Sequence, residues 1–268
     1  MKLKKIASIG VLVIIGGWMI YGLNRIVTRP YVSNAAEEKT IEPQKEEGKT
    51  QKSKTKKENA KEEEVGLPAG SKTDWNLLLV SPTHPLEEDF SEDMFSTLDN
   101  GMLVDKRMVG SLDQLQQAAT EAGFPLVIVS AYRSISYQEQ IFQDYLDRWT
   151  AEGYSEKEAL EKVKETSTEP GFSEHHTGLS IDIVDEEWAN SYPSEMLEVS
   201  YAETVGGRWL AEHARDYGFI LRYPKGKEDI TKITFEPWHF RYVGVEHAKY
   251  IEAHQLSLEE YLDLLNEK

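Results

Sequence analysis

The stretch SEHHTGLSID, Ser173 to Asp182, decides the fold because it joins a polar loop to an apolar strand. It holds two adjacent histidines, in a chain with seven histidines among 268 residues. From Gly178 onward the residues alternate, which predicts a β-strand. One face holds Ser180, Asp182 and Val184, and the other holds Leu179, Ile181 and Ile183. A carboxylate among buried strand residues needs a partner, and a cation is a suitable one.

A second cluster of histidine and carboxylate, FEPWHF, lies further along the chain and places His239 three residues after Glu236. It begins another predicted strand, on which His239 and Arg241 share a face. Zinc hydrolases commonly use three protein ligands, and without cysteine these must be His, Asp or Glu. His175, Asp182 and His239 supply such a set, and Glu236 remains to move a proton for a metal-activated water.

A structural role is the alternative for each cluster taken alone. His175 and His176 also fit a surface loop, and His239 also fits a core histidine bonded to a carbonyl. A third segment, SAYRS (residues 130–134), places Arg133 just past a buried strand, where its guanidinium can hold a carboxylate or stabilise an oxyanion. A structural ion pair is the alternative for Arg133. We expect no special role for the other histidines, His84, His213, His247 and His254.

The rest of the C-terminal part mixes helices and short strands without strict alternation, which predicts an α+β fold with a small, mainly antiparallel sheet flanked by helices. Capping patterns and spacing predict helices at residues 110–124, 134–149, 206–218 and 257–265, with a capping box at Ser155 and Glu158. Ser111 is the expected N-cap of the first helix and Gly123 its end, and Ser136 and Glu139 are the expected capping box of the second. In that second helix Ile141, Tyr145 and Trp149 recur at helical spacing. Strands are predicted at residues 125–131, 178–184 and 237–244.

The N-terminal 71 residues differ in composition from the rest. Three lysines precede an apolar run at residues 6–23, roughly 27 Å of helix, which predicts a single-pass membrane anchor within residues 1–33. A cleaved signal peptide is the alternative. Residues 34–71, with eight Lys and nine Glu, predict a disordered tether. The lysines before the apolar run place residues 72–268, the predicted folded domain, outside the cell membrane.

Charge excludes one class of partner for this domain. Residues 72–268 carry 17 of the 30 Lys and Arg and 38 of the 47 Asp and Glu, a net charge of −21. Such a surface does not attract polyanions, so we expect no nucleic-acid partner. We also expect the protein to be a monomer.

Taken together, the segments SAYRS with SYQEQ, SEHHTGLSID and EPWHFRYVG resemble the VanY and LdcB-type D-alanyl carboxypeptidases, zinc peptidases of the LAS group. The family pattern S-x-H-x-x-G-x-x-x-D followed by E-x-W-H is met in full. The resemblance extends from about residue 75 to the C-terminal helix, and it implies the LAS fold, cell-wall remodelling and release of C-terminal D-alanine from peptidoglycan stem peptides.

Carried over residue by residue, the resemblance implies Zn²⁺ held by His175, Asp182 and His239. It implies Glu236 as general base and then acid, and Arg133 as the group that steadies the oxyanion or holds the substrate. The implied substrate-binding residues are Arg133, Gln138, Ser173, Tyr223 and Trp238. Gln138 and Ser173 match positions that help bind the terminal carboxylate, and His176 occupies a variable position, for which we expect no zinc bond.

The resemblance leaves the choice between D,D- and L,D-carboxypeptidase open, because both use the same zinc site. Two other classes remain as alternatives: an endopeptidase or amidase of the same fold, and a non-catalytic wall-binding domain. The Arg133 and Gln138 pair disfavours the first, and the complete set of ligands with Glu236 disfavours the second.

Overall fold

A four-stranded antiparallel sheet carries both segments that hold the candidate ligands. The computed structural model describes residues 66–192 and 195–266, and its strands follow the order β3-β4-β6-β5. The bounds are β3 Leu126–Ser130, β4 Ser180–Asp185, β5 Phe219–Leu221 and β6 His239–Tyr242. A separate hairpin pairs β1 Phe95–Thr97 with β2 Leu103–Asp105. The predicted α+β class with a small antiparallel sheet is confirmed.

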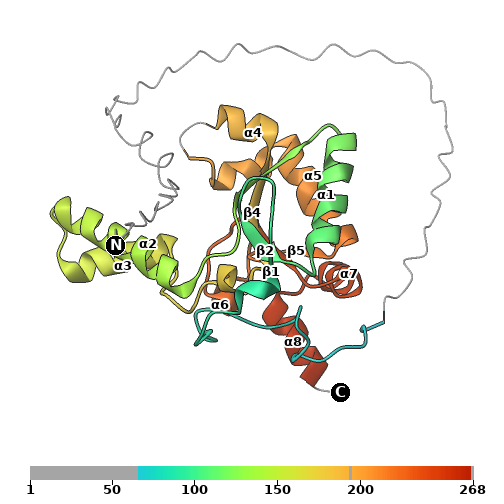
Figure 1. Ribbon diagram of the computed structural model, residues 1–268, viewed down its shortest axis with the longest axis horizontal. Coiled ribbons are helices and arrows are strands. Elements are labelled where there is room, and N and C mark those ends of the chain that lie inside the picture. Colours follow the sequence, from blue (N-terminus) through green and yellow to red (C-terminus); the bar gives the residue numbers. More distant parts are fainter. Residues whose placement is uncertain (1–65, 193–194, 267–268) are drawn as a thin grey trace, which may run out of the picture. The chain divides into compact units, whose positions relative to one another are not determined.

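Helices surround this sheet (Figure 1). The helices of the described residues are α1 Val109–Glu121, α2 Ile135–Ala151, α3 Glu156–Thr166, α4 Glu186–Ser191, α5 Val205–His213, α6 Glu228–Thr231, α7 Val245–Ala253 and α8 Leu258–Asn266. Short 3₁₀ helices lie at Glu92–Met94, Glu174–Thr177, Val199–Glu203 and Ala214–Tyr217. Helices α2 and α3 pack on each other, on the side of the sheet away from α1 and α5 (Figure 1).

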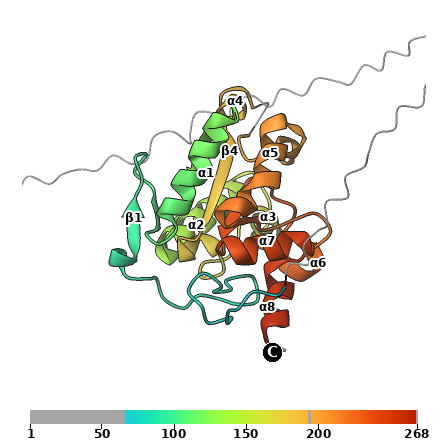
Figure 2. The ribbon, with the colours of Figure 1, turned by 90° about the vertical axis from the view of Figure 1, so that its right-hand side faces the viewer.

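Two apolar cores hold these elements together. The first packs α1 and α5 against the sheet and includes Leu112, Leu115, Ile181, Ile183, Leu210 and Phe240. The second packs α7 and α8 on residues before β1 and includes Leu77, Ile220, Val243, Ile251, Leu258 and Leu262. Figure 2 shows α7 and α8 next to each other below α5. The second core therefore joins the beginning and the end of the described chain.

The register of β4 and β6 explains why the two motifs meet. Asp182 lies directly opposite His239, and Ser180 lies opposite Arg241. Residues opposite each other in neighbouring strands point to the same side of the sheet. The predicted sharing of one face by His239 and Arg241 is confirmed by this register, and the same face receives Asp182.

The predicted N-cap of the first helix was wrong. Helix α1 begins at Val109, two residues before Ser111, with Met108 at its N-cap position. Met108 is fully buried, and the Asp105 carboxylate accepts a hydrogen bond from the Arg107 backbone N–H at 2.9 Å, which fixes the turn ahead of the helix. The burial of Met108 and the turn at Asp105 therefore make the helix begin at Val109, before Ser111. Its predicted end holds, since Gly123 follows the helix in the left-handed region at φ +90°.

The predicted capping box of the second helix was also wrong. Ser134, not Ser136, is the N-cap of α2, and its hydroxyl accepts from the Tyr137 N–H at 3.0 Å. The Asp89 carboxylate accepts from the Ile135 N–H at 2.9 Å, so a distant side chain satisfies another end group. The buried positions of this helix are Gln138 and Phe142, while Tyr145 is exposed, so the face of Ile141, Tyr145 and Trp149 is not its main packing face.

Other local predictions agree with the structure. The capping box of Ser155 and Glu158 is present at α3. The helix before Gly218 ends as a 3₁₀ turn, with Gly218 at φ +87°. The predicted anchor and most of the tether lie outside the described residues. Within the described ranges 66–192 and 195–266, no helix is both long enough and apolar enough to cross a bilayer.

Gly178 makes the turn from the 3₁₀ helix into β4, at φ +66°. A Cβ there would lie 2.6 Å from the Phe95 ring and 3.0 Å from the Asp105 backbone nitrogen. Gly178→Ala is expected to lower the free energy of unfolding by about 3 kcal/mol in urea titration, through backbone strain and this clash. Gly123→Ala is the control, because it shares the positive φ but has nothing within 4 Å. Equal losses of unfolding free energy in the two variants would show that the contacts of Gly178 with Phe95 and Asp105 add no cost beyond the positive φ.

Candidate metal centre and active site

Three buried side chains from separate segments converge in the first half of β4. His175 comes from the 3₁₀ helix, Asp182 from β4 and His239 from the start of β6. One ligand atom from each lies within 4.8 Å of the others. His175 Nε2 is 3.2 Å from Asp182 Oδ2, and His239 Nδ1 is 3.1 Å from Asp182 Oδ1. The structure thus brings together the three predicted ligands.

In both His175 and His239, one ring nitrogen faces Asp182 and the other faces a hydrogen-bond acceptor of the protein. His175 Nδ1 is 2.8 Å from the Ala131 carbonyl oxygen, so Nδ1 donates and the Nε2 lone pair faces Asp182. His239 is turned the other way, with Nε2 3.2 Å from a Glu174 carboxylate oxygen and Nδ1 facing Asp182. Such outer contacts are typical of metal-binding histidines.

The charges of the group suit a cation. Burial, together with the nearby Arg133 guanidinium, lowers the pKa of His175 to about 4 although Asp182 raises it, so this ring is neutral at pH 7. Burial raises the pKa of the Asp182 carboxyl, but the two imidazoles outweigh it and hold that pKa well below its usual range. Burial lowers the pKa of His239, whereas Asp182 and Glu174 raise it to about 9. A cation here therefore competes with a proton on His239.

The donors present fit zinc. Asp182 Oδ1 is buried and meets no hydrogen-bond donor at suitable geometry within the described part of the chain, although His239 Nδ1 is close. Once His239 Nδ1 has lost its proton, this nitrogen and Asp182 Oδ1 are two acceptors 3.1 Å apart, an arrangement that a shared cation explains well. Two imidazole nitrogens and one carboxylate are ligand types that zinc accepts, with a fourth position left for substrate or water.

Glu236 lies beside this group without belonging to it. One of its carboxylate oxygens is 3.6 Å from His239 Nδ1, and its side chain is 25% exposed, so it reaches both the ligands and solvent. Backbone bonds hold it in place: its N–H donates to the Tyr223 carbonyl, and its own carbonyl accepts from the His239 N–H. Burial raises the pKa of Glu236 to about 7, with Asp182 adding to the rise. A carboxyl with this pKa can take up and return a proton near neutral pH.

Arg133 lies next to the group, on the loop after β3. Its Nε is buried and has no hydrogen-bond partner among residues 66–192 and 195–266. A guanidinium Nε held without a partner beside a candidate metal site is available to an incoming carboxylate or oxyanion. The structural ion pair that sequence left open is not found for Arg133 among the described residues.

The two adjacent histidines fasten this loop. His175 Nδ1 donates to the carbonyl of Ala131, and His176 Nδ1 lies 2.7 Å from the carbonyl of Arg133. His176 Nε2 accepts from the Gly171 N–H at 3.1 Å, so its Nδ1 must carry the proton and donate. His176 therefore does not face the ligand group, as predicted, and instead holds the backbone of Arg133.

His176→Phe removes both of these hydrogen bonds in a fully buried position. We expect KM for a peptide substrate to rise about tenfold, since Arg133 loses its fixed position, while zinc affinity stays within about twofold. Steady-state kinetics and a zinc competition titration measure the two quantities. A fall in zinc affinity of the same size as the rise in KM would show that His176 supports the ligand group instead.

Gln138 and Ser173 are both buried near this loop. The Gln138 amide nitrogen donates to Ser167 Oγ at 3.0 Å and to the Thr168 carbonyl at 2.8 Å, and its Oε1 has no partner within the described ranges. The free atom of Gln138 is thus an acceptor, which suits a substrate N–H better than a carboxylate. Ser173 precedes the 3₁₀ helix and its hydroxyl caps none of the helix N–H groups.

Two aromatic residues border the site. The Tyr223 ring centroid is 4.7 Å from that of His239, and Tyr223 is almost fully buried. Trp238 is partly buried and packs against the first core, while its carbonyl accepts from the Ile183 N–H at 2.9 Å. Tyr223 is therefore placed to limit the motion of the His239 imidazole. Trp238 helps to fix the start of β6.

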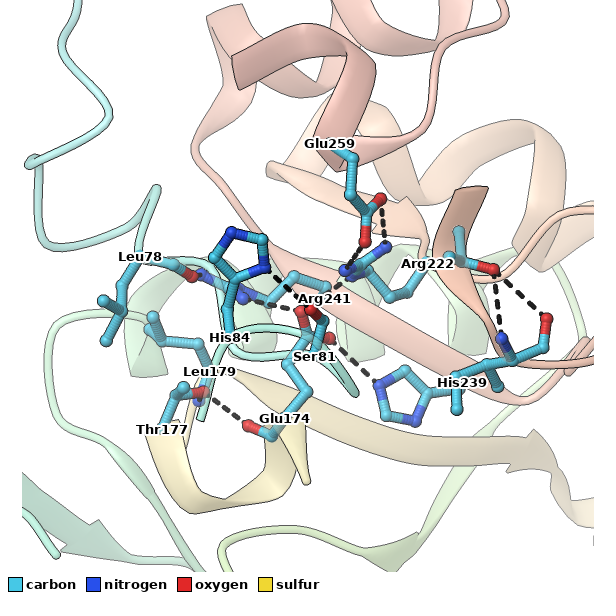
Figure 3. A network of polar contacts seen from close by, with 12 residues as sticks. Leu78, Ser81, His84, Glu174, Thr177, Leu179, Arg222, His239, Arg241 and Glu259 are labelled. Atoms are coloured by element: carbon cyan, nitrogen blue, oxygen red, sulfur yellow. Dashed lines mark hydrogen bonds and ion pairs between the residues drawn. The ribbon is translucent and has the colours of Figure 1, made fainter. Parts of the chain in front are cut away.

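Sequence reasoning missed Glu174, which contacts the candidate ligand His239, and Arg222, which pairs with Glu174 (Figure 3). Glu174 is fully buried and contacts His239 as well as the guanidinium groups of Arg222 and Arg241. The available signal was the pair of Glu174 and His175, but a carboxylate next to a histidine is common and did not stand out.

Comparisons with known proteins agree with this geometry. The family described as VanY, D-alanyl-D-alanine carboxypeptidase, matches residues 101–245. A D-alanyl-D-alanine carboxypeptidase of Enterococcus faecalis is 35% identical over 194 residues, which cover 72% of this chain and 68% of that protein. Matches to two further relatives cover 53% and 59% of their lengths.

Solved structures are similar to the described chain as well. A variant of the vancomycin-resistance D,D-pentapeptidase VanY, in complex with Zn(II), has a TM-score of 0.59 at 34% identity and covers 70% of this chain and 99% of its own. The LdcB LD-carboxypeptidase has a TM-score of 0.60 at 34% identity, over 70% of this chain and 86% of its own.

Proposed function

Since this chain belongs to the VanY family of D-alanyl-D-alanine carboxypeptidases, we propose that it is a zinc-dependent carboxypeptidase that releases C-terminal D-alanine from peptidoglycan stem peptides. The observation that carries the proposal is the buried group of His175, Asp182 and His239, with the Glu236 carboxylate 3.6 Å from one ligand nitrogen. That arrangement supplies ligands and a proton acceptor at one place.

The residues of this chain divide the work of peptide hydrolysis. When bound by His175, Asp182 and His239, zinc supplies Lewis-acid activation of the scissile carbonyl and of the attacking water. Glu236, as a carboxylate, accepts the proton of that water and later returns it to the leaving amine of D-alanine. The Arg133 guanidinium stabilises negative charge on the substrate, on its terminal carboxylate or on the oxygen of the scissile carbonyl.

An unpartnered arginine beside the ligands favours cleavage at a chain end. A C-terminal carboxylate is an anion that an endopeptidase or amidase substrate lacks at the scissile site, and Arg133 Nε has no other partner among the described residues. The acceptor Oε1 of Gln138 fits the N–H of the same terminal residue. These two atoms support a carboxypeptidase over an endopeptidase of the same fold.

Release of D-alanine from defined peptides tests the function. The full chain in mild detergent is incubated with a tetrapeptide stem, a pentapeptide stem or a cross-linked dimer of stem peptides, with and without chelator, and products are identified by mass spectrometry. We expect D-alanine from a stem peptide only when zinc is present, and the peptide that reacts assigns D,D- or L,D-specificity. Cleavage of cross-linked dimers alone would overturn the carboxypeptidase proposal, and no cleavage would favour a wall-binding role.

We also propose that residues 1–33 anchor the protein in the cell membrane and that residues 34–71 tether the domain on the cell-wall side. The basic residues before the apolar run, and the balanced charge of the tether, support this placement. Protease added to intact cells is expected to release the domain while residues 1–33 stay with the membrane. A mature N-terminus near Ala35 in culture medium would instead show a cleaved signal peptide.

A further inference from the structure

The Glu174 carboxylate is completely buried between two arginines and a candidate metal ligand (Figure 3). Its Oε1 accepts two hydrogen bonds, from Arg222 Nε and from Arg241 Nη1, each at 2.7 Å. Its Oε2 lies 3.2 Å from His239 Nε2. Both guanidinium groups thus use one oxygen, and the other oxygen is left for the imidazole.

We propose that Glu174 is a positioning residue that holds His239 as the Nε2–H tautomer and so keeps the Nδ1 lone pair directed at Asp182 and the metal. The inference rests on the proposed metallopeptidase function and deepens it. A carboxylate accepts hydrogen bonds and cannot donate them, so His239 Nε2 must carry a proton toward it. A ring fixed this way offers Nδ1, which is 3.1 Å from Asp182 Oδ1.

The two arginines keep the Glu174 oxygens in this orientation. Arg222 also donates to Glu259 on α8, at 2.7 and 3.0 Å, and Arg241 also donates to the carbonyls of Asn76 and Leu78, at 3.2 and 2.7 Å. Neither guanidinium can turn without losing several of these bonds. The Glu174 carboxylate is therefore fixed from behind, and it can in turn fix His239.

A purely structural role is the competing explanation, since Glu174 also balances the charge of Arg222 and Arg241 at zero exposure. Glu259 separates the two explanations. It pairs with the same Arg222, in a largely buried position, but it has no contact with His239 among the described residues. Loss of charge at Glu259 therefore affects the arginine without affecting the ligand.

Substitution by glutamine acts differently at the two positions. In Glu174→Gln the single amide oxygen is claimed by the two guanidinium donors, so the amide NH₂ faces His239 Nε2. This NH₂ is a donor, and His239 must then accept at Nε2 and carry its proton on Nδ1. Without a lone pair on Nδ1, the ring cannot bind a metal on the side of Asp182. Glu259→Gln leaves the contact between Glu174 and His239 as it is.

Zinc affinity of the full chain in mild detergent, measured by competition with a chromophoric chelator, tests the proposal. We expect Glu174→Gln to weaken zinc binding by about 10- to 100-fold and Glu259→Gln to change it by no more than about twofold. The Tm of the metal-free protein should fall in both variants, and further in Glu174→Gln, because Glu174 balances two buried guanidinium groups and Glu259 only one. Unchanged zinc affinity in Glu174→Gln, or equal weakening in both variants, would overturn the positioning role.

A measurement on the unmodified protein does not depend on how the variants fold. Nitrogen-15 NMR of the histidine side chains in the zinc-loaded chain is expected to show His239 with the metal on Nδ1 and a proton on Nε2. Metal on Nε2 would overturn the proposal. Zinc affinity and the NMR spectrum do not depend on catalysis. If the protein bound zinc but released no D-alanine, the proposed function would be wrong, and the positioning role of Glu174 would be unaffected.

Discussion

Replacing Glu236 by glutamine is expected to lower kcat for D-alanine release by about 10²- to 10⁴-fold while zinc stays bound. The amide keeps the size and shape of the side chain but cannot accept a proton from water. The candidate ligands are His175, Asp182 and His239, so the metal is expected to lose no bond in this variant. Steady-state rates on the reactive stem peptide, together with zinc content of the purified protein, measure both parts.

The exposed Glu228 of α6 provides a matched control, because Glu228→Gln makes the same chemical change away from the site. Its kcat should equal that of the unmodified protein. A Glu236→Gln variant that keeps more than about a tenth of the rate would assign the proton transfer to another group.

The pH dependence of kcat/KM should report the same carboxyl. Glu236 works as a base in its ionised form, so activity is lost as pH falls through its pKa. Burial raises this pKa to about 7, and a bound dication would lower it, so kcat/KM should rise with pH and level off at or below about pH 7. The acid limb should vanish from the residual activity of Glu236→Gln. An acid limb that persists in this variant would belong to a different residue.

Replacing Asp182 by asparagine is expected to remove D-alanine release and zinc binding together. Asp182 is the only anionic member of the candidate ligand group, and its two oxygens face His175 and His239 at 3.2 and 3.1 Å. The amide nitrogen of asparagine cannot ligate a cation, and the remaining oxygen carries no net charge. The variant should therefore resemble the unmodified protein treated with chelator, with activity below detection in both.

Thermal unfolding gives a second measure of this prediction. Zinc at about a thousand times its dissociation constant should stabilise the unmodified protein by about 4 kcal/mol, seen as a higher Tm. Asp182→Asn should show no such rise, whereas Asp263→Asn, at an exposed position of α8, should retain it in full. A zinc-dependent rise in Tm for Asp182→Asn would mean that the cation binds elsewhere.

The ligand set could be predicted from sequence because its signals are local and periodic. Alternation in residues 178–184 placed Asp182 on one strand face, and the same rule put His239 and Arg241 together on another strand. The sequence did not reveal that these two strands are neighbours. The structure shows that they pair, with Asp182 opposite His239. Pairing of strands so far apart along the chain depends on packing, which no short motif encodes.

Errors arose where tertiary contacts override local signals. Ser111 and Ser136 are good N-cap residues, yet buried Met108 and the carboxylate of Asp89 set the actual helix starts. Glu174 was missed for a related reason. Its partners Arg222 and Arg241 lie 48 and 67 residues away, so the buried ion cluster exists only once the sheet and α8 are assembled.

That cluster also defines how much chain the catalytic unit requires. The family match covers residues 101–245, but Arg241 is held by the carbonyls of Asn76 and Leu78, and Arg222 by Glu259 of α8. Trimming at either end of the matched span would leave a buried guanidinium with fewer partners, and the disturbance would reach His239 through Glu174. Limits for expression, fusion or domain transfer should therefore lie outside residues 76–266, and a peptidase that clips either flank would inactivate the enzyme without touching a ligand.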